Sequence, residues 1–386
     1  MLVMKFGGTS VGDGKSRRAA VNHILNASVP PIVVVSAMGR KGAPYATDTL
    51  KDLVSQEGGE VSLRDMDLIM SCGEIISAVV MAQAIRNKGR SAKALTGAQA
   101  GIATDGKYSN ATVTGVDIRP IKKLLEDGII PVITGFQGDF EGDFTTLGRG
   151  GSDTTAAVLA KALSADEVQI FTDVEGVLTT DPAMNNNAKI LPFLTYEEVL
   201  EMAHLGAKVI HPKAVEILEE ARIPIRIRST TKESLGTLIS SSFGGNNLRQ
   251  KQVVSSVAAI PSRCLVEVKN PDVASVFQKV AKAGVSVDLI NVSLESISFT
   301  IEATEKEKVA YVLPDALITS GFGKVSVIGA AMRGIPGVMA RVVQALSQKG
   351  INIIRTADSH TSISCLVKED ELKKAVEALH DAFLLG

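Results

Sequence analysis

The sequence predicts an α/β protein in which a mostly parallel sheet covered by helices is followed by two smaller units of one repeated pattern. The first part, up to about residue 240, alternates short apolar β-branched runs with longer amphipathic stretches, an order that favours parallel crossover units. Beyond it, two segments repeat the order strand, turn with proline, helix ending at glycine, strand, strand and acidic-started helix. The length of 386 residues allows two or three domains.

The strands expected in the first part are the apolar runs at 2–7, 31–38, 91–97, 129–136, 167–174 and 223–229. The helices expected there are Ser16–Ala27, Glu74–Asn87, Asp117–Asp127, Asp153–Leu163 and Tyr196–Leu205. Sheets of this kind bind ligands at the carboxyl ends of their strands. Glycines gather where those ends are expected, so we place a ligand site at that edge of the sheet.

The predicted boundaries give a first domain at 1–240 and a linker with one spare strand at 241–262. The first repeat is expected at 263–322 and the second repeat at 323–386. The second repeat lacks a final strand, and the spare strand at 252–260 is expected to pair there.

Composition excludes several classes of protein. Lys plus Arg number 41 against 42 for Asp plus Glu, which leaves no overall positive charge to collect nucleic acid. No run approaches about 18 uninterrupted apolar residues, so no membrane partner is expected. The N-terminal stretch carries Lys5 and paired glycines where a signal peptide would be apolar, and the three cysteines are scattered. We therefore expect a cytoplasmic protein.

The strongest local motif joins a strand to a glycine pair. Lys5 lies in the strand, and Gly7 and Gly8 follow it before the first helix. Backbone amides without side chains approach a phosphate closely, and a lysine adds a point charge. The alternative is a plain strand-to-helix turn.

Other known site patterns are incomplete in this sequence. A P-loop would need glycine where Thr9 stands, and a dinucleotide fingerprint would need glycine where Asp153 stands. The histidines are expected to serve packing or surface roles, and no residue is predicted to be a metal ligand.

A series of motifs along the chain resembles that of aspartate kinases. It comprises VMKFGGTSVG, VVSAMGRKG followed by ATD, SCGE, GFQG, TTLGRGGSDTTA, FTDVEGVLTTDP and GAKVIHPKA, in family order. The two repeats resemble the paired, ferredoxin-like βαββαβ ACT domains of the same enzymes, and the first part resembles the amino-acid-kinase (carbamate-kinase-like) fold. GRKGAPYATD, LTGAQAG and RTADSHTSI are most similar to the monofunctional isozyme that diaminopimelate inhibits.

This resemblance implies phosphorylation of the side-chain carboxylate of L-aspartate to 4-phospho-L-aspartate, with ATP and Mg²⁺ as cofactors. Such a transfer requires positioning and charge neutralisation rather than covalent catalysis. Lys5, Lys208 and Asp153 are the implied catalytic residues. The implied ATP-binding residues are Lys5, Phe6, Gly7, Gly8, Ser10, Ser36, Thr172, Asp173, Thr180, Asp181, Pro182, Lys208 and Val209. For Asp173 and Asp181 the alternative is a cap of a helix or turn.

Aspartate needs a cation for its α-carboxylate and an anion for its α-ammonium. The planar fork of Arg149 suits the first, and Glu74 and Asp153 suit the second. The full implied substrate pocket is Thr47, Glu74, Phe136, Arg149, Gly150, Gly151, Ser152 and Asp153. As alternatives, Glu74 would be an acid at a helix N-terminus and Asp153 an N-cap.

The repeats imply regulation, since catalysis does not require them. An end-product amino acid (diaminopimelate, lysine or threonine) is expected to bind between ACT units of two chains, in a homodimer or homotetramer. The residues expected to contact it are Asp272, Asp288, Asn291, Ile335, Gly337 and Asn352. A ligand-free dimerisation platform is the alternative for the repeats. For the whole chain, the alternatives are a glutamate or acetylglutamate kinase of the same fold and a non-catalytic amino-acid sensor.

Overall fold

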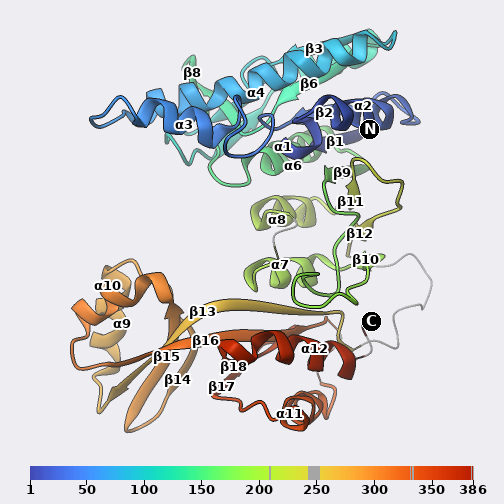
Figure 1. The fold of residues 1–386 in the computed structure, drawn as a ribbon. Helices are drawn as coiled ribbons and strands as arrows, with labels where there is room; N and C mark the ends of the chain where they lie inside the picture. Colours follow the sequence, from blue (N-terminus) through green and yellow to red (C-terminus); the bar gives the residue numbers. More distant parts are fainter. Residues whose placement is uncertain (208–209, 242–252, 331, 333, 384, 386) are drawn as a thin grey trace. The chain divides into compact units, whose positions relative to one another are not determined.

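The computed structural model describes residues 1–386 except 208–209, 242–252, 331, 333, 384 and 386 (Figure 1). The chain forms two compact units, and each is described by itself. The first unit comprises Met1–Val177, Ile190–Val199 and Lys208–Gly244, and the second comprises Leu178–Lys189, Leu200–Ala207 and Gly245–Gly386.

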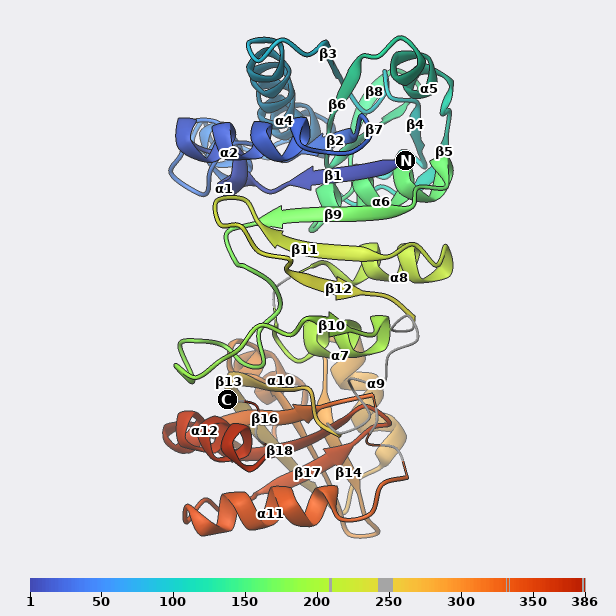
Figure 2. The same cartoon turned by 90° about the vertical axis from the view of Figure 1, so that its right-hand side faces the viewer.

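The first unit is built on an eight-stranded sheet, and Figure 2 shows several of its strands lying lengthwise across the view, side by side. In sheet order its strands are β10 (Phe193–Leu194), β12 (Thr237–Ile239), β11 (Ile225–Ser229), β9 (Glu167–Thr172), β1 (Leu2–Phe6), β2 (Ile32–Val35), β6 (Ile130–Thr134) and β3 (Ala92–Leu95). Neighbouring strands run parallel except β11 and β12. The mostly parallel sheet predicted from the apolar runs is confirmed.

A second, four-stranded sheet in this unit was not predicted. Its strands, in order, are β5 (Val113–Val116), β4 (Ile102–Thr104), β7 (Gln137–Phe140) and β8 (Asp143–Thr146). These strands are short and rich in polar residues and glycine, so they lack the apolar β-branched runs that mark the main sheet.

The helices of the first unit are α1 (Gly8–Val11), α2 (Gly14–Leu25), α3 (Thr47–Ser55), α4 (Leu63–Arg86), α5 (Arg119–Glu126), α6 (Gly151–Leu163) and α8 (Pro212–Glu220). Helix α7 (Tyr196–His204) crosses the division between the two units. The prediction that α4 begins at Glu74 is wrong. The helix begins at Leu63, where the Ser62 hydroxyl accepts a hydrogen bond from the Asp65 amide at 3.1 Å.

Helix α4 contributes to the main core. Its side chains Ala78, Met81 and Ile85 are buried in one cluster with Val33 of β2 and Val132 of β6. Among the described helices, α4 alone is long and apolar enough to cross a membrane by length and composition. The cluster accounts for most of the apolar residues of its C-terminal half, as expected for a helix at the core of a globular domain.

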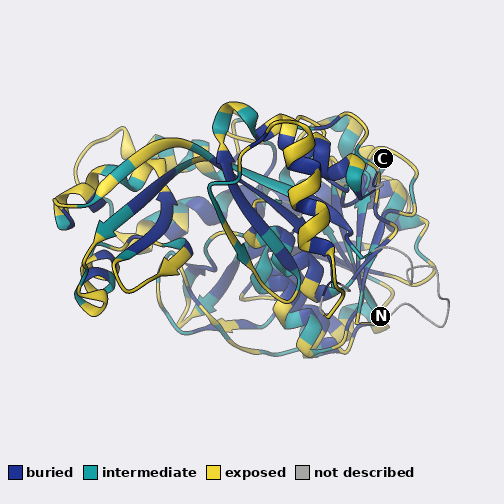
Figure 3. Cartoon of the chain, turned by 90° about the horizontal axis from the view of Figure 1, so that it is seen from below, coloured by how far each residue is buried: buried dark blue, intermediate teal, exposed yellow. Residues whose placement is uncertain are grey.

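The second unit contains one six-stranded antiparallel sheet. Its strands, in order, are β14 (Asp288–Val292), β15 (Ser296–Glu302), β13 (Ser256–Lys269), β16 (Leu317–Ile328), β18 (Ser362–Lys368) and β17 (Arg355–Asp358). Its helices are α9 (Val273–Lys282), α10 (Lys306–Val312), α11 (Val338–Gln348) and α12 (Leu372–Ala382), with short 3₁₀ turns at Ala303–Glu305 and Glu369–Glu371. In Figure 3, which colours the chain by burial, many of the buried residues (dark blue) lie along strands, whereas loops are mostly exposed (yellow).

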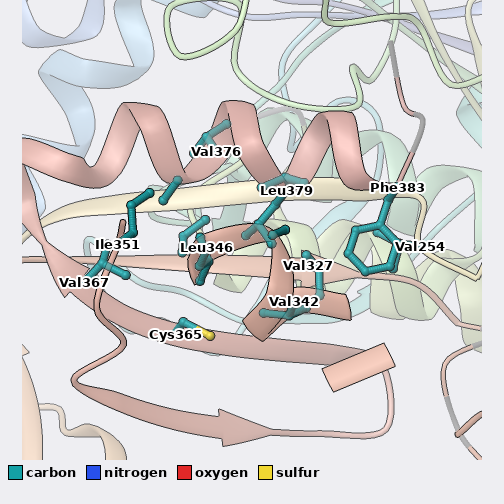
Figure 4. Close-up of a cluster of buried hydrophobic side chains, with 14 of the residues drawn as sticks. Val254, Val327, Val342, Leu346, Ile351, Cys365, Val367, Val376, Leu379 and Phe383 are labelled. Carbon is teal, nitrogen blue, oxygen red and sulfur yellow. The ribbon is translucent and has the colours of Figure 1, made fainter. Parts of the chain in front are cut away.

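The two repeats share their longest strands. Residues 263–269 of β13 pair with β15 of the first repeat, whereas residues 256–260 pair with 324–328 of β16 in the second repeat. Each repeat therefore completes a βαββαβ unit with a segment of a strand that also serves the other. The second repeat has its own core, which packs α11 and α12 on the sheet through Leu346, Leu379 and Phe383 (Figure 4).

A short segment far from the repeats in sequence also belongs to the second unit. The amide of Val257 in β13 donates to the Thr179 carbonyl oxygen at 2.8 Å. The Thr179 hydroxyl and Nε2 of the buried His380 in α12 share a hydrogen bond of 2.8 Å. Residues 178–189, which the predicted boundaries assign to the catalytic domain, therefore pack with the repeats.

Candidate active site

Strand β1 carries the lysine at the centre of the site. Lys5 Nζ forms an ion pair with Oδ1 of Asp153 at 2.7 Å, and both side chains are largely buried. A Cβ placed on Gly7 would lie 3.7 Å from the same Nζ, so the ammonium group lies beside the bare backbone at Gly7. This combination of a cation and an amide without a side chain suits an anionic phosphate.

Gly8 packs against the loop that follows β2. The Gly39 amide donates to the Gly8 carbonyl oxygen at 2.9 Å, and a Cβ on Gly8 would lie 2.5 Å from the Gly39 carbonyl oxygen. No larger residue fits this position. A cavity of about 460 Å³ opens beside it, lined by Gly8, Ser36, Ala37, Gly39, Arg40, Lys41, Ala46, Thr47 and Asp48. The structure thus places three of the predicted residues, Gly8, Ser36 and Thr47, around one cavity.

Glu74 lies in the middle of α4 with only 2% of its surface exposed. Its Oε1 accepts a hydrogen bond from the Ala37 amide at 3.1 Å, and its Oε2 has no hydrogen-bond partner among the described residues. Burial raises the pKa of Glu74 to about 8, and the hydrogen bond from the Ala37 amide only partly offsets this rise. The alternative role at a helix N-terminus is wrong, since the helix begins at Leu63.

Arg149 lies on a glycine loop between β8 and α6. Gly148 and Gly150 have φ of +71° and +72°, a conformation that favours glycine, and they hold Arg149 between them. The Arg149 side chain is exposed and forms no ion pair with any residue in the described part of the chain. Its planar cation is available to a ligand.

The rest of the predicted substrate pocket surrounds the start of α6. A Cβ on Gly151 would lie 2.7 Å from the Phe136 ring, and one on Gly135 would lie 2.7 Å from the Ser152 side chain. The N-cap alternative for Asp153 is wrong, because Gly150 is the N-cap and Asp153 lies inside the first turn. Its carboxylate faces Lys5 instead, and Oδ2 accepts from the His211 amide at 3.4 Å.

The motif FTDVEGVLTTDP, which is expected to contact the nucleotide, begins in the last two residues of β9. Asp173 Oδ2 forms an ion pair with Arg40 at 2.6 Å, and Oδ1 accepts from the Thr172 hydroxyl at 3.1 Å. Ser10 is buried, its hydroxyl donates to the Phe171 carbonyl oxygen at 3.0 Å, and its amide donates to Gly7. The donors of Ser10 are therefore engaged within the protein.

Phe6 is fully buried and its ring stacks on that of Phe171, with the centroids 4.7 Å apart. The Phe6 side chain therefore serves packing within the protein.

The remaining predicted ATP-binding residues are not related to this site by the structure. Thr180, Asp181 and Pro182 belong to the second unit, where the Asp181 carboxylate accepts from the Ala183 amide at 2.8 Å in a turn. Lys208 and Val209 lie outside the described residues.

The predicted effector residues divide between the two repeats. Asp272 caps α9 by accepting from the Ser275 amide, and Asp288 forms an ion pair with the buried Lys324. Asn291, Ile335 and Asn352 are exposed. Gly337, with φ of +92°, is the N-cap of α11, which has no side-chain cap.

Two residues of the site escaped prediction. Arg40 gave no signal beyond its place next to Gly39. Asp67 did give a weak one, because it is a charged residue in the apolar run of α4, two helical turns before Glu74 and so on a similar face.

Comparison with known proteins identifies the chain. Residues 1–229 match the amino acid kinase family, and residues 325–383 match the ACT domain. Aspartokinase 1 of Bacillus subtilis is 43% identical over 100% of this chain and 99% of its own length. The chain belongs to the aspartokinase family. It is therefore an enzyme, a kinase that acts on aspartate, and the two alternatives of another amino-acid kinase and a silent sensor are set aside.

Solved structures show the same fold over the whole length. A crystal structure of Escherichia coli aspartokinase III in complex with aspartate and ADP (R-state) has a TM-score of 0.78 and 24% identity, with 100% of both chains covered. The same enzyme in complex with lysine and aspartate (T-state) has a TM-score of 0.77 and 25% identity, with 99% of both chains covered. The aspartokinase architecture of a kinase domain followed by ACT domains is thus shared.

Proposed function

We propose that this aspartokinase transfers the γ-phosphoryl group of ATP to the side-chain carboxylate of L-aspartate through the site at the carboxyl ends of β1 and β2. The observation that carries the proposal is the ion pair of Lys5 with Asp153, which joins a phosphate-binding turn to the helix that begins just after Arg149. One end of this arrangement suits phosphate, and the other suits an amino acid.

Lys5 and the amides of Gly7 and Gly8 bind the β and γ phosphates. No general base is required, since the acceptor carboxylate is already ionised at neutral pH. Catalysis then consists of alignment and of neutralising charge on the transferred group. When bound with the nucleotide, Mg²⁺ would supply further neutralisation of the phosphate charge beside Lys5. Lys208, Thr180, Asp181 and Pro182 keep their predicted nucleotide-binding roles.

Arg149 binds the α-carboxylate of aspartate with its two-pronged fork. Glu74 binds the α-ammonium group through Oε2, the buried oxygen that has no hydrogen bond among the described residues. Because the pKa of Glu74 is about 8, its carboxyl group is mostly protonated at pH 7 in the absence of substrate. Arrival of the ammonium group favours the ionised form, so aspartate binding releases a proton.

The ACT repeats bind an end-product amino acid and reduce kinase activity. The lysine complex of Escherichia coli aspartokinase III, described as a T-state, supports this role, as does the ACT domain match. Diaminopimelate, lysine and threonine are the candidates, the first favoured by the resemblance to the diaminopimelate-sensitive isozyme. A homodimer or homotetramer joined through the ACT domains and a cytoplasmic location complete the proposal.

The site is tested by coupled ADP release with aspartate or glutamate in the wild type, Lys5→Ala and a control variant, Lys15→Ala. Lys15 is an exposed residue in the first turn of α2. We expect turnover with aspartate alone and a loss of about 3 kcal/mol in transition-state stabilisation for Lys5→Ala only. Unchanged turnover in Lys5→Ala would remove the phosphate role.

The regulatory role is tested by thermal unfolding with each candidate amino acid. A ligand of the folded state raises the melting temperature and should lower kinase activity at the same concentrations. Absence of both effects for all three amino acids, singly and in pairs, supports the ligand-free platform instead.

A further inference from the structure

Asp67 of α4 is a buried carboxylate to which aspartate binding assigns no direct role. It is 0% exposed and accepts four hydrogen bonds. Oδ2 accepts from the backbone amides of Thr146 at 2.7 Å and Ser109 at 2.8 Å. Oδ1 accepts from the hydroxyl groups of the same two residues, at 2.7 Å and 3.3 Å. One carboxylate thus joins two segments that are far apart in sequence.

The two segments are the turn at 109–110 and the end of β8. Ser109 has φ of +68°, an unfavourable conformation for a residue with a side chain, and Asp67 holds both of its donors there. The Ala111 amide donates to the Thr146 carbonyl oxygen at 2.8 Å, which adds a direct link between the segments. The turn is therefore held against β8 at the point where that strand ends.

The glycine loop that carries Arg149 begins at this point. A Cβ on Gly148 would lie 2.9 Å from the Asn110 Oδ1 and 3.3 Å from the Ser109 carbonyl oxygen, so Gly148 packs directly on the turn. On the other side, the Leu147 amide donates to the Phe136 carbonyl oxygen at 2.8 Å. The turn that Asp67 holds is thus one wall of the loop.

The same helix carries Glu74, two turns further on. A helix is a rigid spacer of about 1.5 Å per residue, so Asp67 and Glu74 keep a fixed separation. Aspartate, with α-ammonium and α-carboxylate groups on one carbon, needs its anionic and cationic partners at a set distance. Helix α4 provides the anion directly, and through Asp67 it sets the position of the loop that provides the cation.

We propose that Asp67 is a positioning residue for aspartate, acting through the loop of Arg149. This rests on the proposed role of Arg149 in binding the α-carboxylate. Loss of the Asp67 network shifts the guanidinium relative to Glu74 and weakens aspartate binding, while the phosphate-binding turn at Lys5 is unaffected.

The test is a double-mutant cycle with Asp67→Asn and Arg149→Ala, reading the KM for aspartate and the KM for ATP separately. In Asp67→Asn an amide group faces N–H donors, so the network is broken with little change in volume. We expect a rise of about 10- to 100-fold in the KM for aspartate, the scale of a misplacement near 1 Å, with the KM for ATP changed by less than about 3-fold. The double variant should be no worse than Arg149→Ala alone.

Two further variants distinguish a specific effect on aspartate binding from a general loss of stability. Thr146→Val keeps the shape and removes one hydroxyl donor, and it should raise the KM for aspartate by about 3-fold or more, reflecting the loss of one hydrogen bond to a charged group. Tyr196→Phe is the control, because it removes a different buried hydrogen bond of the first unit, from the Tyr196 hydroxyl to the Ile223 carbonyl oxygen at 2.7 Å. It should leave the KM for aspartate unchanged.

The outcomes separate this inference from the proposed function. If Arg149→Ala itself leaves the KM for aspartate unchanged, the proposed role of Arg149 fails. If Arg149→Ala raises it but Asp67→Asn does not, or if the two effects multiply in the double variant, Asp67 does not act through Arg149. An equal rise in both KM values for Asp67→Asn also overturns the inference, since it indicates a general structural defect.

Discussion

Asp67 and Glu74 lie on one helix, two turns apart, and both are almost completely buried, yet their surroundings are opposite. Asp67 accepts four hydrogen bonds from Ser109 and Thr146. Glu74 accepts one from Ala37, and its Oε2 has no hydrogen-bond partner in the part of the chain that the structure describes. A buried carboxylate whose oxygens all accept hydrogen bonds has a structural role. A buried carboxylate with an unsatisfied oxygen is a candidate for binding a ligand. The number of hydrogen bonds that each carboxylate accepts, rather than its burial, distinguishes the two roles.

The comparison predicts opposite effects on stability. Asp67→Ala leaves the buried Thr146 amide and the partly buried Ser109 amide without acceptors, each costing about 1 to 3 kcal/mol, so we expect a loss of about 3 kcal/mol or more in the free energy of unfolding. Glu74→Gln, at the incomplete site, leaves no amide without an acceptor, and near pH 7 it should raise the free energy of unfolding, because Gln lacks the ionisation that favours the unfolded chain. Urea unfolding of both variants measures the difference. Equal destabilisation by Asp67→Ala and Glu74→Gln would contradict the assignment of a structural role to Asp67 alone.

Kinase activity, unlike stability, should be lowered by the change at Glu74. Glu74→Gln removes the negative partner of the substrate ammonium group, and a hydrogen bond to a charged group is worth about 1.5 to 3 kcal/mol. We therefore expect kcat/KM for aspartate to fall by about 10- to 150-fold. Steady-state kinetics at saturating ATP give this value, and an unchanged KM for ATP is the internal control. Full activity in Glu74→Gln would contradict the proposed ammonium site.

The pH dependence of stability should come from Glu74. Its pKa of about 8 in the folded protein exceeds the ordinary value of 4.5, so between these values the folded protein holds a proton that the unfolded chain has released. The free energy of unfolding should therefore fall as pH rises through this range, by at most about 1.4 kcal/mol per pH unit for one proton. Urea unfolding of the ligand-free enzyme across this range tests it. Glu74→Gln should lack this component, and an identical pH profile in the variant would refute the assignment.

An exposed carboxylate, Asp272, is expected to give a smaller loss of stability than the buried Asp67. Asp272 in the first repeat accepts a single hydrogen bond, from the Ser275 amide at the start of α9. Asp272→Ala should cost about 1 kcal/mol, the usual value of an N-cap, and it should leave kinase kinetics without effector unchanged. Thermal unfolding measures the loss. A cost as large as that of Asp67→Ala would mean that partner number does not govern the effect.

The apolar β-branched runs were sufficient to predict the main sheet, because parallel buried strands carry their signal within a few residues. The small sheet was missed for the opposite reason. Strand β8 has the sequence DFTT, and Thr146 at its end is held by Asp67, a residue remote in the sequence. Local pattern does not reveal such a strand.

The sequence was sufficient to predict which residues belong to the candidate site, but not the contacts and burial of their side chains. The motif series identified Lys5, Glu74 and Arg149, whereas the Lys5–Asp153 ion pair and the raised pKa of Glu74 depend on packing. The start of α4 at Leu63 was missed because its first turn is exposed and mixes charged with apolar residues, so that only the Ser62 cap marks it.

The attachment of Thr179 to the repeats has a practical consequence. Its carbonyl and hydroxyl groups bond to Val257 and His380. The next residues, Thr180 and Asp181, belong to the end of the motif FTDVEGVLTTDP, for which we propose a nucleotide-binding role. A shortened enzyme ending near residue 240 would keep that motif but lose both of its anchors. Removing the regulatory half is therefore a poor route to a feedback-resistant enzyme, and point changes in the loops proposed to bind the effector are the better engineering choice.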